Sequence, residues 1–294
     1  MYGRTCAACT IHAQSYRRSR LKFFSCRTTV GRYKMPGKPV SDAAMTDQLQ
    51  RSTNVPLVRV EGKTYRDGSC WEPKRLVANP TLLRDMRDTT AREAEARFGF
   101  PPSLYFYVGH ACPTFASDGN TFVFVFAGNT FDDDEGSMTH FDTGGLYCGK
   151  VHLDSSVDPC DYLTMHRIES LATWRDEFER YVSTFFDSPA AYVLGQKPTK
   201  ADAHGRHFHP ENERRAWTWE LQLSRDHDLR AGLKRLWLTT EAHDKLADAV
   251  TEIVDRQEKL RWRAILTACL APPIATDDAT SLCRAAEAEI ASWL

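Results

Sequence analysis

The densest group of chemically reactive side chains lies between Met138 and Gly149, in the sequence Met-Thr-His-Phe-Asp-Thr-Gly-Gly-Leu-Tyr-Cys-Gly. His140 and Asp142 carry an imidazole and a carboxylate, the two groups that enzymes use most often for proton transfer. Gly144 and Gly145 follow at once, and a ligand can approach a glycine backbone closely because there is no side chain. We therefore expect His140 and Asp142 to line one pocket with the Gly144-Gly145 turn.

A buried strand is predicted just before this group. Residues 121–127 are β-branched or aromatic almost throughout, which is typical of a strand in a protein core. Loops at the ends of such strands often carry functional residues. The acidic run from Asp132 to Glu135 intervenes, but it lacks the ligand spacing of an EF-hand and is expected to be a hydrated loop.

The remaining periodicities indicate an α+β fold with a mixed sheet core and a helical C-terminal layer. We expect one domain over residues 46–294, rich in strands to about residue 223 and helical over 240–294. Alternating or apolar runs predict strands, and apolar residues at spacings of three and four predict helices. The expected strands are 56–65, 104–110, 121–127, 145–153 and 215–223, and the expected helices are 80–98, 168–186, 240–256, 258–270 and 279–293.

Composition places the chain among globular proteins that do not enter a membrane. The 294 residues are 42% hydrophobic with a mean hydropathy of −0.47, and no run approaches the roughly 20 apolar residues of a membrane span. The cysteines beyond residue 45 follow no framework spacing, which favours reduced thiols and a cytoplasmic location. We expect a soluble protein that contacts no membrane.

The first 45 residues differ in character from the rest of the chain. Residues 1–40 contain nine lysines or arginines and no acidic residue, and they lack the apolar periodicity of a core segment. Three explanations remain open: an organellar presequence, a basic nucleic-acid tail, or an upstream extension that is not translated. We favour the last, with Met35 or Met45 as the working start, and otherwise expect a disordered basic leader.

Deletion of residues 1–44 should leave folding and any activity intact, because nothing in their pattern indicates packing on a core. The check is a thermal melt of the full-length and shortened chains. A fall of more than a few degrees in melting temperature would show that the leader packs on the domain.

Three segments spread over residues 57–223 occur in an order that resembles the ADP-ribosyltransferase superfamily. They are Leu57-Val-Arg-Val60, Thr139-His-Phe-Asp-Thr143 and Trp219-Glu-Leu-Gln222. In that superfamily a first-strand Arg or His holds NAD, a Ser/Thr-rich central strand supports the site, and a late-strand Glu does the chemistry. The central segment here is not Ser-Thr-Ser, and the intervals are longer than in compact members.

The resemblance implies an enzyme that uses NAD as its substrate and cleaves the nicotinamide–ribose bond. Glu220 would stabilise the positive charge that grows on the ribose as nicotinamide leaves. The resemblance also implies that His140 and Asp142 lie beside the reacting centre. The expected NAD-binding residues are Arg59 at the pyrophosphate, Thr139 and Thr143 on the central strand, Gly144 and Gly145 through their N–H groups, and Tyr147 as a stacking ring.

The acceptor of the transferred group is not readable from the sequence. An unknown protein or nucleic acid could accept it, water could accept it in plain NAD hydrolysis, and an inhibitory partner could restrain the activity.

Each of these residues also has a purely structural interpretation. Arg59 on a strand is more often part of a cross-strand pair than a phosphate clamp. Trp217 and Trp219 share one face of a strand and are expected in the core. Glu220 would point to the opposite face with Thr218, either as a solvated charge or as the partner of Arg214 or Arg215.

Two further classes of function remain open. His204, His207 and His209, together with His140 and Asp142, could serve a metal-dependent hydrolase, although the helical ligand spacing of such enzymes is missing. The many aromatic residues could instead form a groove in a non-enzymatic binding module. NAD turnover supports the first class, chelator-sensitive hydrolysis with stoichiometric metal the second, and neither the third.

Overall fold

The computed structural model describes residues 55–61, 73–84, 89–110, 121–131, 136–199, 212–271, 276 and 278–294. These residues belong to one compact unit, Pro39–Leu294. They form an α+β fold around a six-stranded sheet with the strand order β5-β6-β3-β1-β4-β8, and β2 and β7 pair separately. The strands are β1 (Leu57–Glu61), β2 (Thr81–Leu82), β3 (Leu104–Val108), β4 (Phe122–Phe126), β5 (Gly136–Thr139), β6 (Glu220–Leu223), β7 (His227–Asp228) and β8 (Leu233–Leu238). The expected fold class is confirmed.

Every pairing between the named strands is antiparallel, and an isolated parallel bridge joins Leu236 to Leu270. Residues that face each other across such pairs point to the same side of the sheet. Glu220 stands opposite Tyr107 on β3 and opposite Thr139 on β5. The register therefore places these three side chains on one face, which we call the site face.

The other face of the sheet is a packed hydrophobic core. It carries Leu221 and Phe106, which stand opposite each other, and the phenylalanines of β4. Rings of Phe106, Phe126 and Phe131 lie with centroids 4.6 to 6.4 Å apart. Aromatic rings at these separations gain attraction beyond their buried area.

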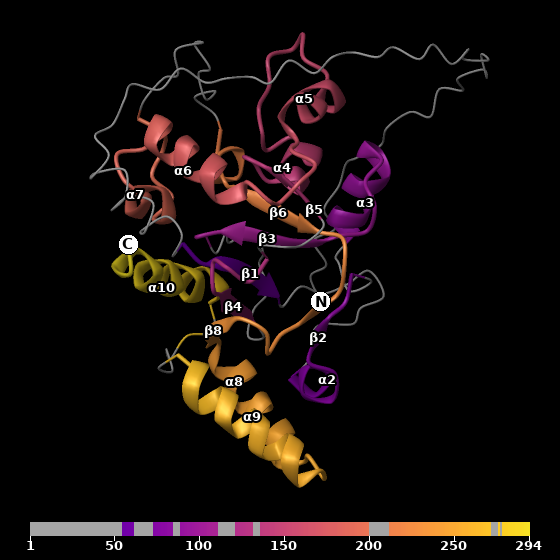
Figure 1. Ribbon diagram of the computed structural model, residues 1–294, viewed down its shortest axis with the longest axis vertical. Coiled ribbons are helices and arrows are strands. Elements are labelled where there is room, and N and C mark those ends of the chain that lie inside the picture. Colours follow the sequence, from indigo (N-terminus) through magenta and orange to yellow (C-terminus); the bar gives the residue numbers. More distant parts are fainter. Residues whose placement is uncertain are drawn as a thin grey trace, which may run out of the picture. The chain divides into compact units, whose positions relative to one another are not determined.

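Helices cover both faces next to β6. They are α2 (Pro73–Ala78), α3 (Thr89–Phe98), α4 (Thr143–Tyr147), α5 (Pro159–His166), α6 (Trp174–Phe185), α7 (Pro189–Val193), α8 (Thr240–Thr251), α9 (Arg256–Cys269) and α10 (Ala279–Ser292), with a short 3-10 turn over Arg214–Ala216. In Figure 1, α3 to α6 gather around the β5–β6 end of the sheet and α8 and α9 lie beyond β8. Phe178 and Tyr181 of α6 pack on Trp219, and α4 lies against α3.

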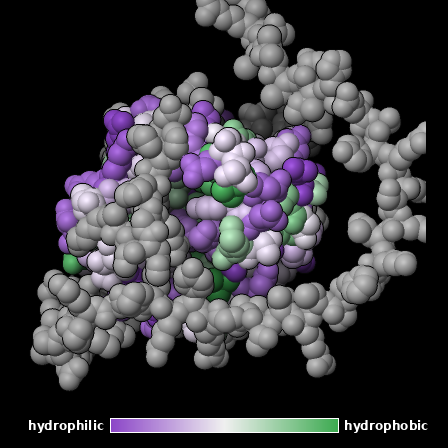
Figure 2. All heavy atoms as spheres, turned by 90° about the horizontal axis from the view of Figure 1, so that it is seen from above, coloured by the Kyte–Doolittle hydropathy of each residue, from purple (hydrophilic) through white to green (hydrophobic). Residues whose placement is uncertain are grey.

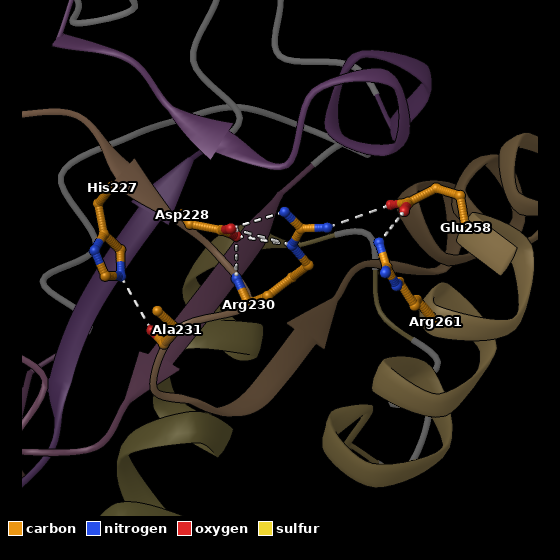
Figure 3. Close-up of polar contacts among 6 residues, drawn as sticks. All are labelled: His227, Asp228, Arg230, Ala231, Glu258 and Arg261. Atoms are coloured by element: carbon orange, nitrogen blue, oxygen red, sulfur yellow. Dashed lines mark hydrogen bonds and ion pairs between the residues drawn. The ribbon is translucent and has the colours of Figure 1, made fainter.

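The expected C-terminal helical layer is present as α8, α9 and α10. An ion-pair network fastens the turn before β8 to α9 (Figure 3). Arg230 donates from Nε and Nη2 to the carboxylate of Asp228 and forms an ion pair with Glu258. Glu258 also forms an ion pair with Arg261, with Oε2 and Nη1 3.4 Å apart. These side chains are exposed or half-buried, and such pairs typically contribute about 0–1 kcal/mol each. The network therefore aligns α9 more than it stabilises the fold.

Two expected elements are wrong, and two begin later than expected: the helix expected from 168 starts at Trp174, and the strand expected from 215 starts at Glu220. Residues 80–98 do not form one helix: Thr81 and Leu82 form β2 against β7, and α3 begins only at Thr89. Leu82 is buried in that pairing, so tertiary packing overrides the helix signal of Asn79-Pro80. Residues 145–153 are not a strand, because Asp142 caps a helix at Thr143 and the chain turns at Gly149, where φ is +66°.

Several sequence predictions fall on residues outside the described ranges. They concern the basic leader 1–45, the acidic run 132–135 and the histidines at 204, 207 and 209. A search of the described helices finds none long and apolar enough to cross a membrane.

Candidate functional site

Glu220 is the centre of a buried polar cluster on the site face. The Thr143 hydroxyl donates to Glu220 Oε1 at 2.6 Å, and Gln222 Nε2 donates to the same oxygen at 2.9 Å. The sequence separates Thr143 from Glu220 by 77 residues, so only the fold can bring them together. Glu220 is 1% exposed, and a carboxylate so deep is normally found with hydrogen-bonding partners.

Local pattern explains why these side chains share the cluster. Residues 220 to 223 alternate across the sheet, so Glu220 and Gln222 share the site face while Leu221 and Leu223 enter the core. The expected alternation on this strand is thus confirmed. The interpretation of Glu220 as a solvated charge is wrong, because Glu220 is buried; Arg215, a suggested partner, binds Asp142 instead.

Asp142 is the second carboxylate of the cluster. Its Oδ1 accepts the N–H of Gly145 and so caps α4, and its Oδ2 accepts Arg215 Nε at 2.6 Å. The hydroxyl of Tyr107 approaches Oδ2 at 3.4 Å from the sheet. Asp142 therefore joins α4, the turn before β6 and strand β3 at one point.

The two glycines of α4 make room for Arg215. A Cβ atom added at Gly145 would lie 2.9 Å from Arg215 Nε, closer than real Cβ atoms come, and 3.1 Å from Arg215 Cβ. At Gly144 the added atom would lie 3.3 Å from Arg215 Nη2, which is tight but not forbidden. Gly145 in particular therefore leaves the space that the arginine occupies where it reaches Asp142.

The substitution Gly145→Ala should destabilise the fold by about 1–3 kcal/mol, the usual cost of overpacking. The added methyl group would push Arg215 away from Asp142, and Asp142 is almost fully buried. Urea denaturation measures the change. In an Arg215→Ala background the same substitution should cost less, because the colliding side chain is gone; equal costs in both backgrounds would contradict the explanation.

Burial raises the pKa of Glu220 to about 8, and the negative charge of Asp142 adds to the rise. Hydrogen bonds from Thr143 and Gln222 oppose it, because they stabilise the charged form. At neutral pH the carboxyl group is therefore mainly protonated. Strongly shifted acids of this kind often belong to functional sites, although structural networks can produce them too.

The structure brings together only part of the expected site. Glu220, Asp142 and Thr143 share the cluster, and Gly144 and Gly145 border it. Gln222, quoted with Glu220 in the resemblance, also belongs to it. Thr139 stands opposite Glu220, but its hydroxyl donates to the backbone carbonyl of Phe141.

Arg59 does not join them. Arg59 stands opposite Phe124 of β4, and Glu61 lies two residues further along β1. The Arg59 guanidinium lies over the ring of Phe106. All of these lie on the face opposite Glu220. Arg59 donates to Glu61 on its own strand at 2.6 Å and to the carbonyl of Tyr105 on β3 at 2.9 Å. It is thus a paired strand arginine, although its carboxylate partner lies on the same strand and not across the sheet.

His140 and Tyr147 also lie apart from the cluster. The imidazole of His140 packs among the rings of Phe141, His166 and Tyr181, with the His166 centroid 4.8 Å away. The partly exposed Tyr147 donates its hydroxyl to Glu93 on α3. His140 and Asp142 therefore belong to two different environments, although one residue separates them.

Sequence reasoning missed three members of the cluster. Ser137 on β5 hydrogen-bonds Gln222 at 3.0 Å, Arg167 hydrogen-bonds Ser137, and Tyr107 reaches Asp142. The alternating strand that contains Tyr107 carries a weak signal, because a tyrosine at every second position suggests a face that is not pure core. No local sequence pattern predicts the role of Arg167, which follows α5 and contacts the cluster only through tertiary packing.

Among the described residues, no group of three or more His, Cys, Asp or Glu side chains is placed to hold a metal ion. Where Figure 2 shows the described residues, seen from above the view of Figure 1, hydrophilic residues lie among scattered hydrophobic ones. No protein-family model matches the chain, and no curated protein matches it either.

Proposed function

We propose that the chain is an NAD-using enzyme of the ADP-ribosyltransferase kind, which cleaves the nicotinamide–ribose bond with Glu220 as its essential carboxylate. One observation carries the proposal: the central and late segments of the resemblance meet, with Thr143 donating to Glu220 and Gln222 beside it. A chance match of short motifs gives no reason for two such segments to converge on one carboxylate.

Cleavage of the nicotinamide–ribose bond is faster with a negative charge beside the ribose. As nicotinamide leaves, positive charge develops at the ribose carbon, and a fixed carboxylate stabilises it without reorganising. The nicotinamide ring of NAD is itself cationic, so its arrival favours the ionised form of Glu220. Binding of NAD should then release a proton from Glu220, whose pKa is about 8 in the free protein.

The cost of the buried carboxyl group also supports a functional role. A carboxyl group in a low-dielectric site costs stability when it ionises, and a neutral side chain of the same shape would avoid that cost. Residues that lower stability in this way often belong to functional sites. Since Glu220 is 1% exposed, NAD must displace some of the side chains that cover it.

Arg59 has no part in this proposal, because it lies on the face opposite Glu220. The arginines near the cluster are Arg215, bound to Asp142, and Arg167, bound to Ser137. The group that receives ADP-ribose is an unknown protein or nucleic acid, or water. We place the reaction in the cytoplasm, and an inhibitory partner would act by keeping the site closed.

The experiment is the release of nicotinamide from NAD by the purified chain, followed by chromatography with and without a chelator. Release that the chelator does not change supports the proposal. A chain that neither binds NAD in calorimetry nor releases nicotinamide contradicts it. Hydrolysis of other substrates that a chelator abolishes would favour the metal-dependent class instead.

A further inference from the structure

Arg167 sits at the outer end of a chain of hydrogen bonds that leads to Glu220. Its Nε and Nη2 atoms both donate to Ser137 Oγ, at 3.0 and 2.9 Å. Its guanidinium lies 3.9 Å from the ring centroid of Phe100, which holds it flat. The stacked ring and the two bonds fix this arginine in one orientation, since a guanidinium is planar and its donors are rigid.

The donors in this chain can point in only one direction. An arginine has no acceptor, so Ser137 Oγ must accept from Arg167 and can direct its own proton to Gln222 Oε1, 3.0 Å away. The amide of Gln222 is thereby oriented with its oxygen toward Ser137 and its nitrogen toward Glu220. Gln222 Nε2 accordingly lies 2.9 Å from Glu220 Oε1 and 3.3 Å from the Thr143 hydroxyl.

We infer that Arg167 is a positioning residue, which acts through Ser137 to hold the Gln222 amide as a donor to Glu220. Its hydrogen bonds in this chain go to Ser137 and not to Glu220. An effect of Arg167 on NAD turnover rests on the proposed function, whereas its effect on the pKa of Glu220 does not.

Loss of either outer member would release the amide. Without Ser137 the amide oxygen of Gln222 has no donor, and without Arg167 the Ser137 hydroxyl is free to accept from the amide instead of donating to it. In both cases Gln222 can rotate and present Oε1 to Glu220, where two oxygen acceptors repel. Glu220 then loses a hydrogen bond that stabilises its charged form, so its pKa rises. Burial lowers the pKa of Arg167, and Glu169, Tyr105 and, last, Glu220 partly oppose this, so the arginine charge also favours the Glu220 carboxylate directly.

The test measures the titration of Glu220 in the free protein. Carboxyl-¹³C glutamate NMR identifies Glu220 as the signal that Glu220→Gln removes. In both Arg167→Met and Ser137→Ala the titration midpoint should rise by about one unit, as expected when a carboxylate loses one charge-assisted hydrogen bond. Ser137→Ala matters most, because it keeps the arginine charge and removes only the link.

Arg175→Met is the matched control. Arg175 is also half-buried beside an aromatic ring, Trp174, and it donates to a carbonyl, that of Gly128. Its contacts do not lead to Glu220, so the Glu220 midpoint should not move. If Arg167→Met does not fold, Ser137→Ala and Arg167→Lys decide the question.

An unchanged midpoint in Ser137→Ala overturns the inference, even if Arg167→Met shifts, because the arginine would then act through its charge alone. If wild-type protein releases nicotinamide, the pH profile of that reaction should shift with the NMR midpoint. If it releases none, the proposed function fails while the titration still tests the hydrogen-bond chain.

Discussion

The substitution Glu220→Gln is expected to slow nicotinamide release by roughly 100- to 1000-fold, the usual loss when a preorganised electrostatic contact is removed. The side chain keeps its size, and its amide oxygen can still accept from Thr143 and Gln222. Only the negative charge disappears. Initial rates at saturating NAD, compared with the wild type at pH 8, measure the effect.

The same variant should be no less stable than the wild type above neutral pH. A neutral amide avoids the cost of ionising a carboxyl group that is fully buried. Glu61→Gln is the matched control, because Glu61 is also a buried strand glutamate but lies on the opposite face, paired with Arg59. It should lose stability, since Arg59 keeps a buried charge, and retain its rate per folded molecule. Glu220→Gln that turns over NAD at the wild-type rate would sink the mechanism.

The second large effect is on pH dependence. Glu220 must be ionised to act, so kcat/KM for NAD should rise with pH and reach half its maximum near pH 8, the pKa of the free protein. The profile of kcat should rise at lower pH, because the cationic nicotinamide ring stabilises the carboxylate in the complex. Rates measured from pH 6 to pH 10 give both profiles, and a flat kcat/KM profile would contradict the assignment.

Stability should follow the opposite trend. The pKa of Glu220 is raised in the folded state from its ordinary value of 4.5 to about 8. The folded protein therefore holds one more proton than the unfolded chain between these values. The contribution of the protonated Glu220 carboxyl group to the free energy of unfolding is complete below pH 4.5. It is lost as the pH rises to 8 and through it, by up to roughly 1.4 kcal/mol per pH unit. Urea denaturation of wild type and Glu220→Gln should diverge over this range.

Sequence reasoning placed the elements with strong periodicity and missed those decided by packing. Helices α8, α9 and α10 and strands β3 and β4 lie where their patterns indicated. The apolar residues after Gly145 suggested a strand, yet the cap supplied by Asp142 starts a helix there. A cap of one residue is a local signal, but its strength depends on the partly buried Arg215 that holds Asp142 in place.

The site shows the same division. Alternation over residues 217–223 was enough to separate Glu220 and Gln222 from Leu221, because side-chain direction in a strand follows a period of two. The partner strands could not be read, so the face of Arg59 relative to Glu220 stayed open. The register of strand pairing decides it, and this register depends on pairings between segments far apart in the sequence, Leu57 with Val108 and Tyr107 with Glu220.

The position of β6 has a consequence for the order in which the chain folds. Strand β6 lies between β3 and β5, and β5 pairs with no other named strand. During synthesis β3 and β5 emerge long before residues 220–223, so each waits with an open edge that can pair with another chain. A ribosome-bound or truncated chain that ends before β6 should therefore aggregate readily, and the Thr143–Glu220 contact can form only late in translation. Such distant pairing also predicts slow refolding, limited by insertion of β6 between β3 and β5.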